Sequence, residues 1–337
     1  MMPLLRLAME LLPAPWIEML VMIQVYVFAA VYATKELMFE VINRGIKKRL
    51  ENDIMTSNAI RSAGAKCVLI TGGDGTIGSE VIKRFLHYGY TVHATVGDVR
   101  KAVEVFASLG GPKLPLTLYD IDFLTPYEVA MFARGFVSRC SEISVVVMCA
   151  GTMLAAPEFV DNVESHMCVN VVSQALLLHL LSPVLVHDAR VVFTSSATAK
   201  VSHFTNLVFH KGGFRLLILF AHQPQGFATI HPGVIPGTLY RNTNSFVRFL
   251  TYRILPYFLS SLLIVHTALR DDLVDGSYYE DCAVKSFGSG LSEKVRHLLN
   301  LDIVVERLLL LNFAFEDKRA IFQAVQMQVE AWAGLED

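Results

Sequence analysis

The sequence predicts an α/β protein with a doubly wound parallel sheet, an N-terminal membrane-anchor helix and C-terminal helices. Three observations support this fold class: an apolar N-terminal block, short β-branched runs that alternate with helix-like stretches, and a glycine-rich turn after the first of these runs. A chain of 337 residues is long enough for one large α/β domain with appendages. We therefore expect an anchor and basic linker over residues 1–60, the α/β domain over 61–290 and a helical extension over 291–337.

The N-terminal block is apolar from Leu11 to about Thr34. Within it, Pro13–Ala33 supplies the roughly 20 apolar residues that span a bilayer, provided that Glu18 lies near a headgroup layer. A cleaved signal peptide and an amphipathic interfacial helix are the alternatives; we favour a retained single anchor because no clean A-x-A site follows the apolar run. Several basic residues follow the block, whereas only Arg6 precedes it. The positive-inside rule therefore places the following domain in the cytosol.

Four apolar, β-branched runs begin after Lys66. They are CVLIT at 67–71, TVHATV at 91–96, SVVVMC at 144–149 and VVFTS at 191–195. Continuous runs of this kind are typical of strands buried on both faces of a parallel sheet. Helix-like sequence separates them, which predicts right-handed βαβ units and hence a doubly wound sheet.

Two further segments are apolar. Ile254–Val265 is too short to span a bilayer and contains Pro256, so we expect a buried core helix, with a membrane-dipping helix as the alternative. The tail from Ser292 has a helical pattern with four leucines at 308–311 between charged flanks. We expect this tail to pack against the domain rather than to carry chemistry.

Composition limits the classes of partner. Hydrophobic residues form 53% of the chain and charged residues 18%, which is apolar for a soluble protein and fits a membrane segment. The net charge of −2 and the lack of a basic cluster argue against nucleic acid as a partner. The five cysteines are widely spaced with no CxxC pair, so the sequence indicates neither a disulfide framework nor a metal site.

The turn TGGDGTIG at Thr71–Gly78 follows a predicted strand and opens a predicted helix, and its glycines satisfy the G-x-G-x-x-G pattern. Glycines allow a tight turn and let the backbone approach a diphosphate, while the helix start supplies aligned N–H donors. This context predicts a Rossmann-type dinucleotide site; a glycine turn without a ligand is the alternative. The expected binding residues are Thr71, Gly72, Gly73, Gly75, Thr76, Ile77 and Gly78.

Asp98 lies 20 residues after Gly78, just past the second strand, where an acidic side chain binds the ribose hydroxyls of NAD. Arg100 or Lys101 could instead accept the 2′-phosphate of NADP, and a solvated surface turn is an equal alternative for all three residues. The sequence therefore predicts NAD or NADP without choosing between them.

Together these residues resemble the short-chain dehydrogenase/reductase family over roughly Lys66–Ser286, and within it the membrane-anchored retinol dehydrogenase-like branch, which includes the dehydrogenase/reductase member X type. Thr76 stands where the family's TGxxxGxG motif has its middle glycine. Asp122 in DFLTP resembles the aspartate that contacts the adenine. Ala150 and Gly151 lie in CAGTM at 149–153, which is similar to the family's NAG motif with cysteine in place of asparagine.

The resemblance continues into the catalytic part of the family's pattern. Asn170 looks like the helical asparagine that maintains a water-linked proton path, with a half-buried structural role as the alternative. Ser196 in TSSATA matches the serine that orients the substrate oxygen. Pro232 and Gly233 in HPGVIPGT match the PG motif near the nicotinamide, and DGSYYED at 275–281 resembles a turn near the end of related members.

The family's YxxxK motif is incomplete in this sequence. No tyrosine lies between Tyr127 and Tyr240. Aligning LVFHKGG on the motif makes Lys211 the lysine and puts Leu207 in place of the tyrosine, whereas spacing from the serine puts Phe209 there. Neither alignment provides a phenol to donate or accept the substrate proton.

The resemblance implies a membrane-associated, NAD(P)-dependent oxidoreductase for a hydrophobic alcohol or ketone of the retinoid, sterol or polyprenol class. His210, His203 or a water held by Lys211 would then replace the phenol. The alternative is an inactive member that binds a nucleotide and serves as a scaffold or sensor. The resemblance also implies an endoplasmic reticulum location, and a homodimer is left open.

Overall fold

The computed structural model describes seven continuous stretches of the chain. These are residues 45–62, 66–107, 113–153, 158–196, 226–233, 259–285 and 315–334, together with residue 155 and shorter pieces within 27–43 and 235–245. The expected anchor at 13–33 lies largely outside the described residues, and the segment 197–225 and the leucine run at 308–311 lie wholly outside them.

A central sheet of eight strands forms the middle layer, in the order β10-β9-β8-β7-β4-β1-β2-β3. All neighbouring strands are parallel except the pair β9 and β10. This arrangement confirms the predicted doubly wound parallel sheet, with β1 at the point where the strand order reverses. The strands are β1 Cys67–Thr71, β2 Thr91–Val96, β3 Leu116–Asp120, β4 Ile143–Met148, β7 Leu185–Thr194, β8 Phe227–Ile230, β9 Ser277–Glu280 and β10 Ala283–Val284, with a separate hairpin of β5 Phe159–Val160 and β6 Val163–Glu164.

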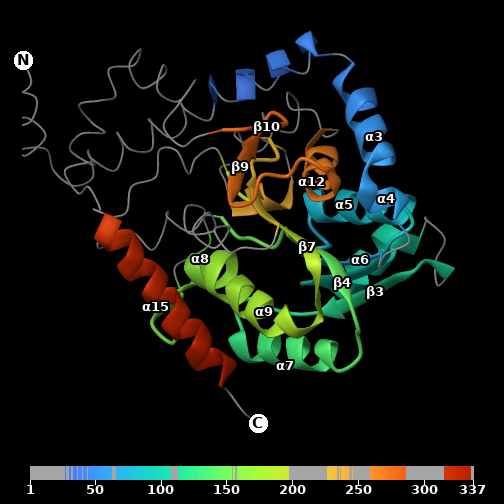
Figure 1. Ribbon diagram of the computed structural model, residues 1–337. Helices are drawn as coiled ribbons and strands as arrows, with labels where there is room; N and C mark the ends of the chain where they lie inside the picture. The colour runs from blue at the N-terminus through green and yellow to red at the C-terminus, as the bar shows by residue number, and fades with distance from the viewer. Residues whose placement is uncertain are drawn as a thin grey trace, which may run out of the picture.

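Helices cover both faces of this sheet (Figure 1). One face carries α7 and a long helix composed of α8, a π-helical turn and α9, with α15 outermost. The other face carries α5, α6, α12 and α3. Their bounds are α3 Ile46–Thr56, α4 Asn58–Arg61, α5 Thr76–His87, α6 Val99–Ala107, α7 Pro126–Val137, α8 Ser165–Met167, the π turn Cys168–Val172, α9 Ser173–Leu181, α12 Leu259–Leu269 and α15 Phe315–Ala333.

Two apolar helices pass through the core. The helix Ser165–Val184 is the one helix in the described part of the chain that is long and apolar enough to cross a membrane, but most of its apolar stretch is buried and it packs against α7 and α15. The expected core helix near 254–265 is observed as α12, in which every residue from Ser260 to Leu269 is buried. Both helices are therefore core elements of the α/β fold.

The two ends of the described chain are fixed to the domain by polar contacts. Lys35 Nζ lies 2.5 Å from both Glu280 Oε1 and Asp281 Oδ2, where β9 ends. At the other end, Trp332 of α15 is buried and its Nε1 donates a hydrogen bond to Asp161 Oδ2 at 2.9 Å. The predicted boundaries of the three parts stay predictions, but the segments on each side of the sheet domain are in contact with it.

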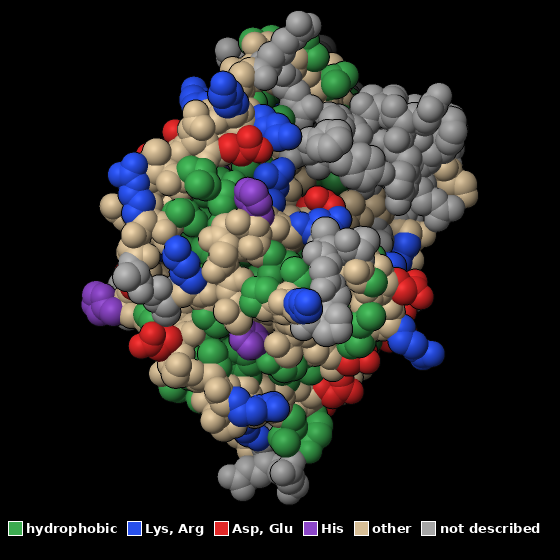
Figure 2. Space-filling model, turned by 90° about the vertical axis from the view of Figure 1, so that its right-hand side faces the viewer, with side chains coloured by type: hydrophobic (Ala, Val, Ile, Leu, Met, Phe, Trp, Pro, Cys, Tyr) green, Lys and Arg blue, Asp and Glu red, His purple; other side chains and the backbone are tan. Residues whose placement is uncertain are grey.

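The surface in Figure 2 shows how charge is distributed on one face of the molecule. The Lys and Arg side chains of the described residues are interspersed there with acidic, apolar and neutral side chains. The expectation that nucleic acid is not a partner stays a prediction.

Candidate functional site

The glycine turn joins β1 to α5 at the carboxyl edge of the sheet. Gly72 has φ +68°, and a Cβ there would come within 2.8 Å of Ala150 Cα, so only glycine fits without strain. A Cβ at Gly78 would come within 2.1 Å of the Gly72 carbonyl oxygen. The third glycine of the motif therefore allows the close helix-to-strand contact that the sequence predicts, and the left-handed turn falls on Gly72 instead of Gly73.

The start of α5 suits an anionic group. Its N-cap is Gly75, which has no side chain to cap the first-turn N–H groups, and the first turn contains no acidic residue. The N–H of Gly73 is already bonded to Thr95 of β2 at 2.8 Å, which fixes the turn against the sheet. The N–H groups at a helix start and the helix dipole favour negative charge at this position. The residues present therefore fit the diphosphate of a dinucleotide.

Thr71 connects this turn to the turn after β4. Its buried Oγ1 accepts hydrogen bonds from the N–H groups of Cys149 and Ala150, both at 3.0 Å, and donates to Gln174 Oε1 at 3.3 Å. Gln174 in turn donates to the Ala150 carbonyl at 2.7 Å. Cys149, which stands in place of the family asparagine, has its pKa raised to about 12 by burial. Thr71 and Gln174 thus supply the hydrogen bonds that join the end of β1 to the turn after β4.

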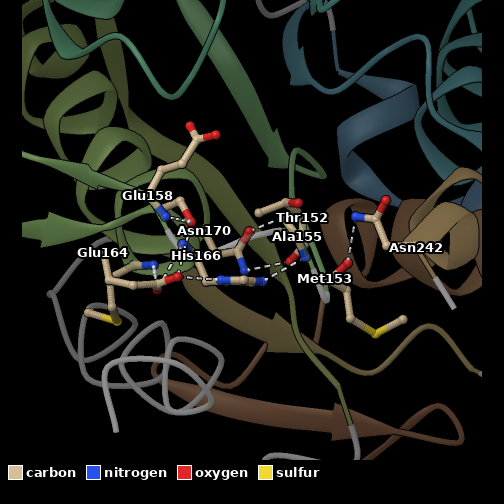
Figure 3. A network of polar contacts seen from close by, with 10 residues as sticks. Thr152, Met153, Ala155, Glu158, Glu164, His166, Asn170 and Asn242 are labelled. Atoms are coloured by element: carbon tan, nitrogen blue, oxygen red, sulfur yellow. Dashed lines mark hydrogen bonds and ion pairs between the residues drawn. The ribbon is translucent and has the colours of Figure 1, made fainter. Parts of the chain in front are cut away.

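Asn170 lies in the π-helical turn and is buried, not half-buried. Its Oδ1 accepts from the Thr152 N–H at 2.8 Å, and its Nδ2 donates to the Thr152 carbonyl at 3.0 Å (Figure 3). The side chain therefore positions the turn that contains Ala150 and Gly151. Its expected part in a proton path stays a prediction.

A second buried polar group near this turn was missed by sequence reasoning. Glu164 caps α8 by accepting from the N–H groups of His166 and Met167, and its Oε1 lies 2.5 Å from His166 Nδ1. The other ring nitrogen of His166 accepts from the Ala155 N–H at 3.2 Å (Figure 3). Burial alone would raise the pKa of Glu164, but the hydrogen bonds from His166, Ser165 and Met167 outweigh it and lower the pKa. Glutamate is not a typical N-cap residue, so the sequence carried no clear signal for this contact.

The HPGVIPGT loop after β8 lies close to both turns. Pro232 is buried, and a Cβ at Gly237 would come within 2.2 Å of Thr76 Oγ1 at the start of α5. Further along, Asn242 Nδ2 donates to the Met153 carbonyl at 3.2 Å (Figure 3). The structure therefore brings the predicted glycine turn, CAGTM turn and PG loop together at one edge of the sheet.

The two acidic residues expected to bind the nucleotide have local structural contacts. Asp98 is exposed, and its Oδ1 caps α6 by accepting from the Lys101 N–H at 3.1 Å. Asp122 is exposed and accepts from the Leu124 N–H at 2.9 Å. In each case these bonds use one carboxylate oxygen. Their roles toward ribose and adenine stay predictions.

The catalytic part of the predicted site is described only in part. Ser196 is half-buried directly after β7, and the N–H of the preceding Ser195 donates to the Ile230 carbonyl of β8 at 2.7 Å. The serine is therefore positioned at the same edge as the glycine turn. Lys211 and the candidate replacements for the tyrosine, Leu207 and Phe209, lie outside the described residues, as do His203 and His210.

A family model described as short chain dehydrogenase matches residues 66–210, which run from the first strand to the histidine before Lys211. The chain carries a short-chain dehydrogenase domain over these residues. It is 27% identical over 253 residues to retinol dehydrogenase 12 of Bos taurus, covering 64% of this chain and 78% of that protein. It is also 28% identical over 229 residues to the dehydrogenase/reductase SDR family member FEY of Arabidopsis thaliana, covering 58% and 60% of the two chains.

Solved structures support the same fold. A short-chain dehydrogenase/reductase from Serratia marcescens BCRC 10948 superposes with a TM-score of 0.54 at 16% identity, covering 63% of this chain and 94% of that one. A dehydrogenase/reductase from Sinorhizobium meliloti 1021 gives 0.53 at 18% identity, with coverage of 65% and 94%. At this identity the likeness shows the fold alone. The family generally binds NAD or NADP, which agrees with the glycine turn of this chain.

Proposed function

We propose that this protein is a membrane-associated, NAD(P)-dependent oxidoreductase that acts on a hydrophobic alcohol or ketone of the retinoid, sterol or polyprenol class. One observation carries the proposal: the uncapped start of α5 meets the CAGTM turn and the HPGVIPGT loop at the carboxyl ends of the parallel strands. In open α/β sheets, this edge at the reversal of strand order is where ligands bind.

The substrate class and the membrane association rest on separate support. The apolar block at 11–34 provides the length of a membrane anchor. The similarity to a protein named retinol dehydrogenase 12 favours a lipid-like alcohol. A substrate of this kind partitions into the bilayer, so an enzyme anchored there would meet it without extracting it into water.

The chemistry expected of the chain's own residues can be stated for the reduction direction. A bound nicotinamide supplies hydride, and the oxygen of the reduced carbonyl must then receive a proton. Ser196 would hold that oxygen by a hydrogen bond. Because no tyrosine lies between Tyr127 and Tyr240, the usual proton donor is missing. Losing a general acid costs about 10²- to 10⁴-fold in rate, which corresponds to roughly 3–5 kcal/mol of barrier.

The missing phenol favours a second candidate function. A chain that keeps the nucleotide cradle but lacks the proton donor can bind NAD(P) without turnover and act as a membrane-bound scaffold or sensor. The joining contacts around Thr71 and Asn170 fit this function equally well, because they position backbone segments and transfer no proton.

The two candidates are separated by binding and turnover measured on the full-length protein in detergent. Calorimetry with NAD, NADH, NADP and NADPH tests the cradle and decides between the two nucleotides. Turnover of a panel of retinoid, sterol and polyprenol alcohols and ketones then tests the chemistry. We expect Ser196→Ala to lower any turnover by about 100-fold and the exposed Ser138→Ala to leave it unchanged.

Each result has a defined meaning. Binding together with turnover that depends on Ser196 supports the oxidoreductase, whereas binding without turnover over the whole panel supports the scaffold. No heat with any of the four nucleotides would refute both functions. Leu207→Tyr and Phe209→Tyr, tested separately, add a phenol in each possible alignment, and the variant that gains activity identifies the correct one.

A further inference from the structure

Cys67, His93 and Cys140 come together at the edge of the sheet opposite the glycine turn. One candidate ligand atom from each residue lies within 4.8 Å of the others, and all three side chains are half-buried. Cys67 begins β1, His93 lies in β2 and Cys140 follows the end of α7. Cys67 precedes Thr71 by the length of β1, which puts the cluster about 13 Å from the glycine turn. It is therefore separate from the nucleotide site.

The imidazole of this cluster is held in place by its neighbours. His93 Nδ1 lies 2.9 Å from the hydroxyl of Tyr119, and the two rings stack with centroids 5.9 Å apart. Phe136 of α7 also contacts the His93 ring in a T-shaped arrangement with ring centroids 5.0 Å apart, and its centroid lies 6.0 Å from that of Tyr119. Histidines that bind metals are usually oriented through a hydrogen bond at one ring nitrogen, which leaves the other for the ion.

The two cysteines are fixed through the backbone. The N–H of Cys140 donates to the Phe136 carbonyl at 2.8 Å, so the same residue that contacts the imidazole also positions this thiol. At the start of β1, the Cys67 carbonyl accepts from Ser144 Oγ at 2.9 Å. The three donor atoms are therefore presented by ordered segments of three different elements.

We propose that Cys67, His93 and Cys140 bind a zinc ion, with a water molecule as the fourth ligand. Two sulfurs and one imidazole nitrogen are the donors that zinc prefers, and the absence of a carboxylate oxygen among these three disfavours magnesium and calcium. Both thiols release their protons to solvent as the two Zn–S bonds form, without oxidation or reduction. The ion would link the start of β1 to β2 and to the end of α7.

The cysteines could instead form a disulfide with each other. That arrangement would leave the oriented imidazole without a function, whereas a zinc ion uses all three side chains. The sequence pattern does not indicate this site, because its three ligands are separated by 26 and 47 positions and share no short motif.

The test uses the full-length protein, purified in detergent under reducing conditions and stripped with a chelator. Cobalt(II) is titrated as the probe, because thiolate ligands give it a charge-transfer absorption band. We expect one cobalt per chain, displacement by zinc, and a higher melting temperature with zinc. Cys140→Ser should remove the band, with binding weaker by at least about 100-fold, and Tyr119→Phe should keep the band with binding about 10- to 100-fold weaker.

Cys282→Ser is the matched control, since Cys282 is also half-buried but lies outside the cluster. It should bind cobalt as the wild type does. The proposal is overturned if the reduced wild type shows no thiolate band, or if the band persists unchanged in Cys140→Ser. It is also overturned if peptide mapping of protein purified without reductant, after thiol blocking, recovers Cys67 disulfide-linked to Cys140. Because Tyr119→Phe removes only one hydroxyl, its affinity change remains informative if Cys140→Ser does not fold.

Discussion

Thr71 holds three backbone segments together through one hydroxyl group. Its Oγ1 accepts from the N–H groups of Cys149 and Ala150 and donates to Gln174. All of these groups lie at the junction of the glycine turn with the end of β4. A buried hydroxyl with three partners is the kind of contact whose loss leaves donors unsatisfied.

Thr71→Val should therefore reduce both stability and nucleotide affinity. Valine matches the shape of threonine but leaves two half-buried N–H groups without this acceptor, which we expect to lower the free energy of unfolding by about 2–3 kcal/mol. Thr71→Ser keeps the hydroxyl and should lose less than half of that amount. Urea denaturation and calorimetric titration with NAD(P)H measure the two effects. Equal stability of Thr71→Val and the wild type would contradict this role.

Much of the site could be predicted at the level of single residues. The glycine turn, Ala150, Gly151, Asn170 and the PG loop are local patterns, and the structure brings their segments to one edge of the sheet. The residues that hold the segments together could not be predicted in this way. Gln174 and Glu164 act through contacts that depend on how a helix is rotated, which the sequence pattern does not specify.

The strands of the fold were predictable where they form runs of five or more mainly apolar residues, whereas the four-residue strand β8 was missed although it is buried along its length. β1 and β2 agree with their predicted runs, because continuous β-branched runs are typical of strands buried on both faces of a parallel sheet. β3 was missed because it is an edge strand, mostly half-buried, and ends in aspartate. The strands β9 and β10 were also missed, because they are short and lie among polar residues, so neither forms a recognisable apolar run.

α12 contains a buried histidine whose protonation opposes folding. His266 Nδ1 has no hydrogen-bond partner among the described residues, and Nε2 lies 3.7 Å from Asp53 Oδ2. Burial and the nearby Arg270 lower the pKa of His266, and Asp53 and Asp272 only partly oppose this shift. The folded state therefore keeps the ring neutral at a pH where the unfolded chain binds a proton.

This histidine should make stability depend on pH in the mildly acidic range. The unfolded chain binds a proton as pH falls below the ordinary value of 6.5, whereas the folded chain does not, so stability is lost from there down to the lowered folded pKa. His266→Leu should flatten the decrease of melting temperature between about pH 7 and pH 5. The exposed His179→Leu serves as control and should behave as the wild type. A His266→Leu profile parallel to that of the wild type would rule out this residue as the cause.

At the scale of the whole molecule, Lys35 joins the N-terminal region to the sheet. It contacts Glu280 and Asp281 at 2.5 Å, and Glu280 is almost fully buried. Burial lowers the pKa of Lys35, but hydrogen bonds and charge from Asp281 and Glu280 outweigh burial and raise it. The ammonium group is therefore charged and compensates a carboxylate that has little access to water.

Removing this charge should loosen the N-terminal region and destabilise the domain. Lys35→Met removes one cation from the buried Glu280 and from Asp281, and because Lys35 is partly exposed we expect a loss of about 1–3 kcal/mol in the free energy of unfolding. The exposed Lys47→Met should change stability by less than about 0.5 kcal/mol. Denaturation curves measure stability, and limited proteolysis before residue 45 measures loosening. Recovery of stability in Lys35→Met combined with Glu280→Gln would identify the uncompensated carboxylate as the reason.

The position of this ion pair bears on how a substrate would arrive. Glu280 ends β9, and β9 runs parallel to β8, so Lys35 is held at the same edge of the sheet as the glycine turn and Ser196. The proposed anchor ends at Ala33, and two residues of chain span at most about 7 Å. In an anchored chain, the edge of the sheet that carries the glycine turn and Ser196 would therefore face the lipid leaflet. Substrate would then reach it by lateral diffusion within the leaflet, and turnover would follow the surface density of substrate per lipid rather than its bulk concentration.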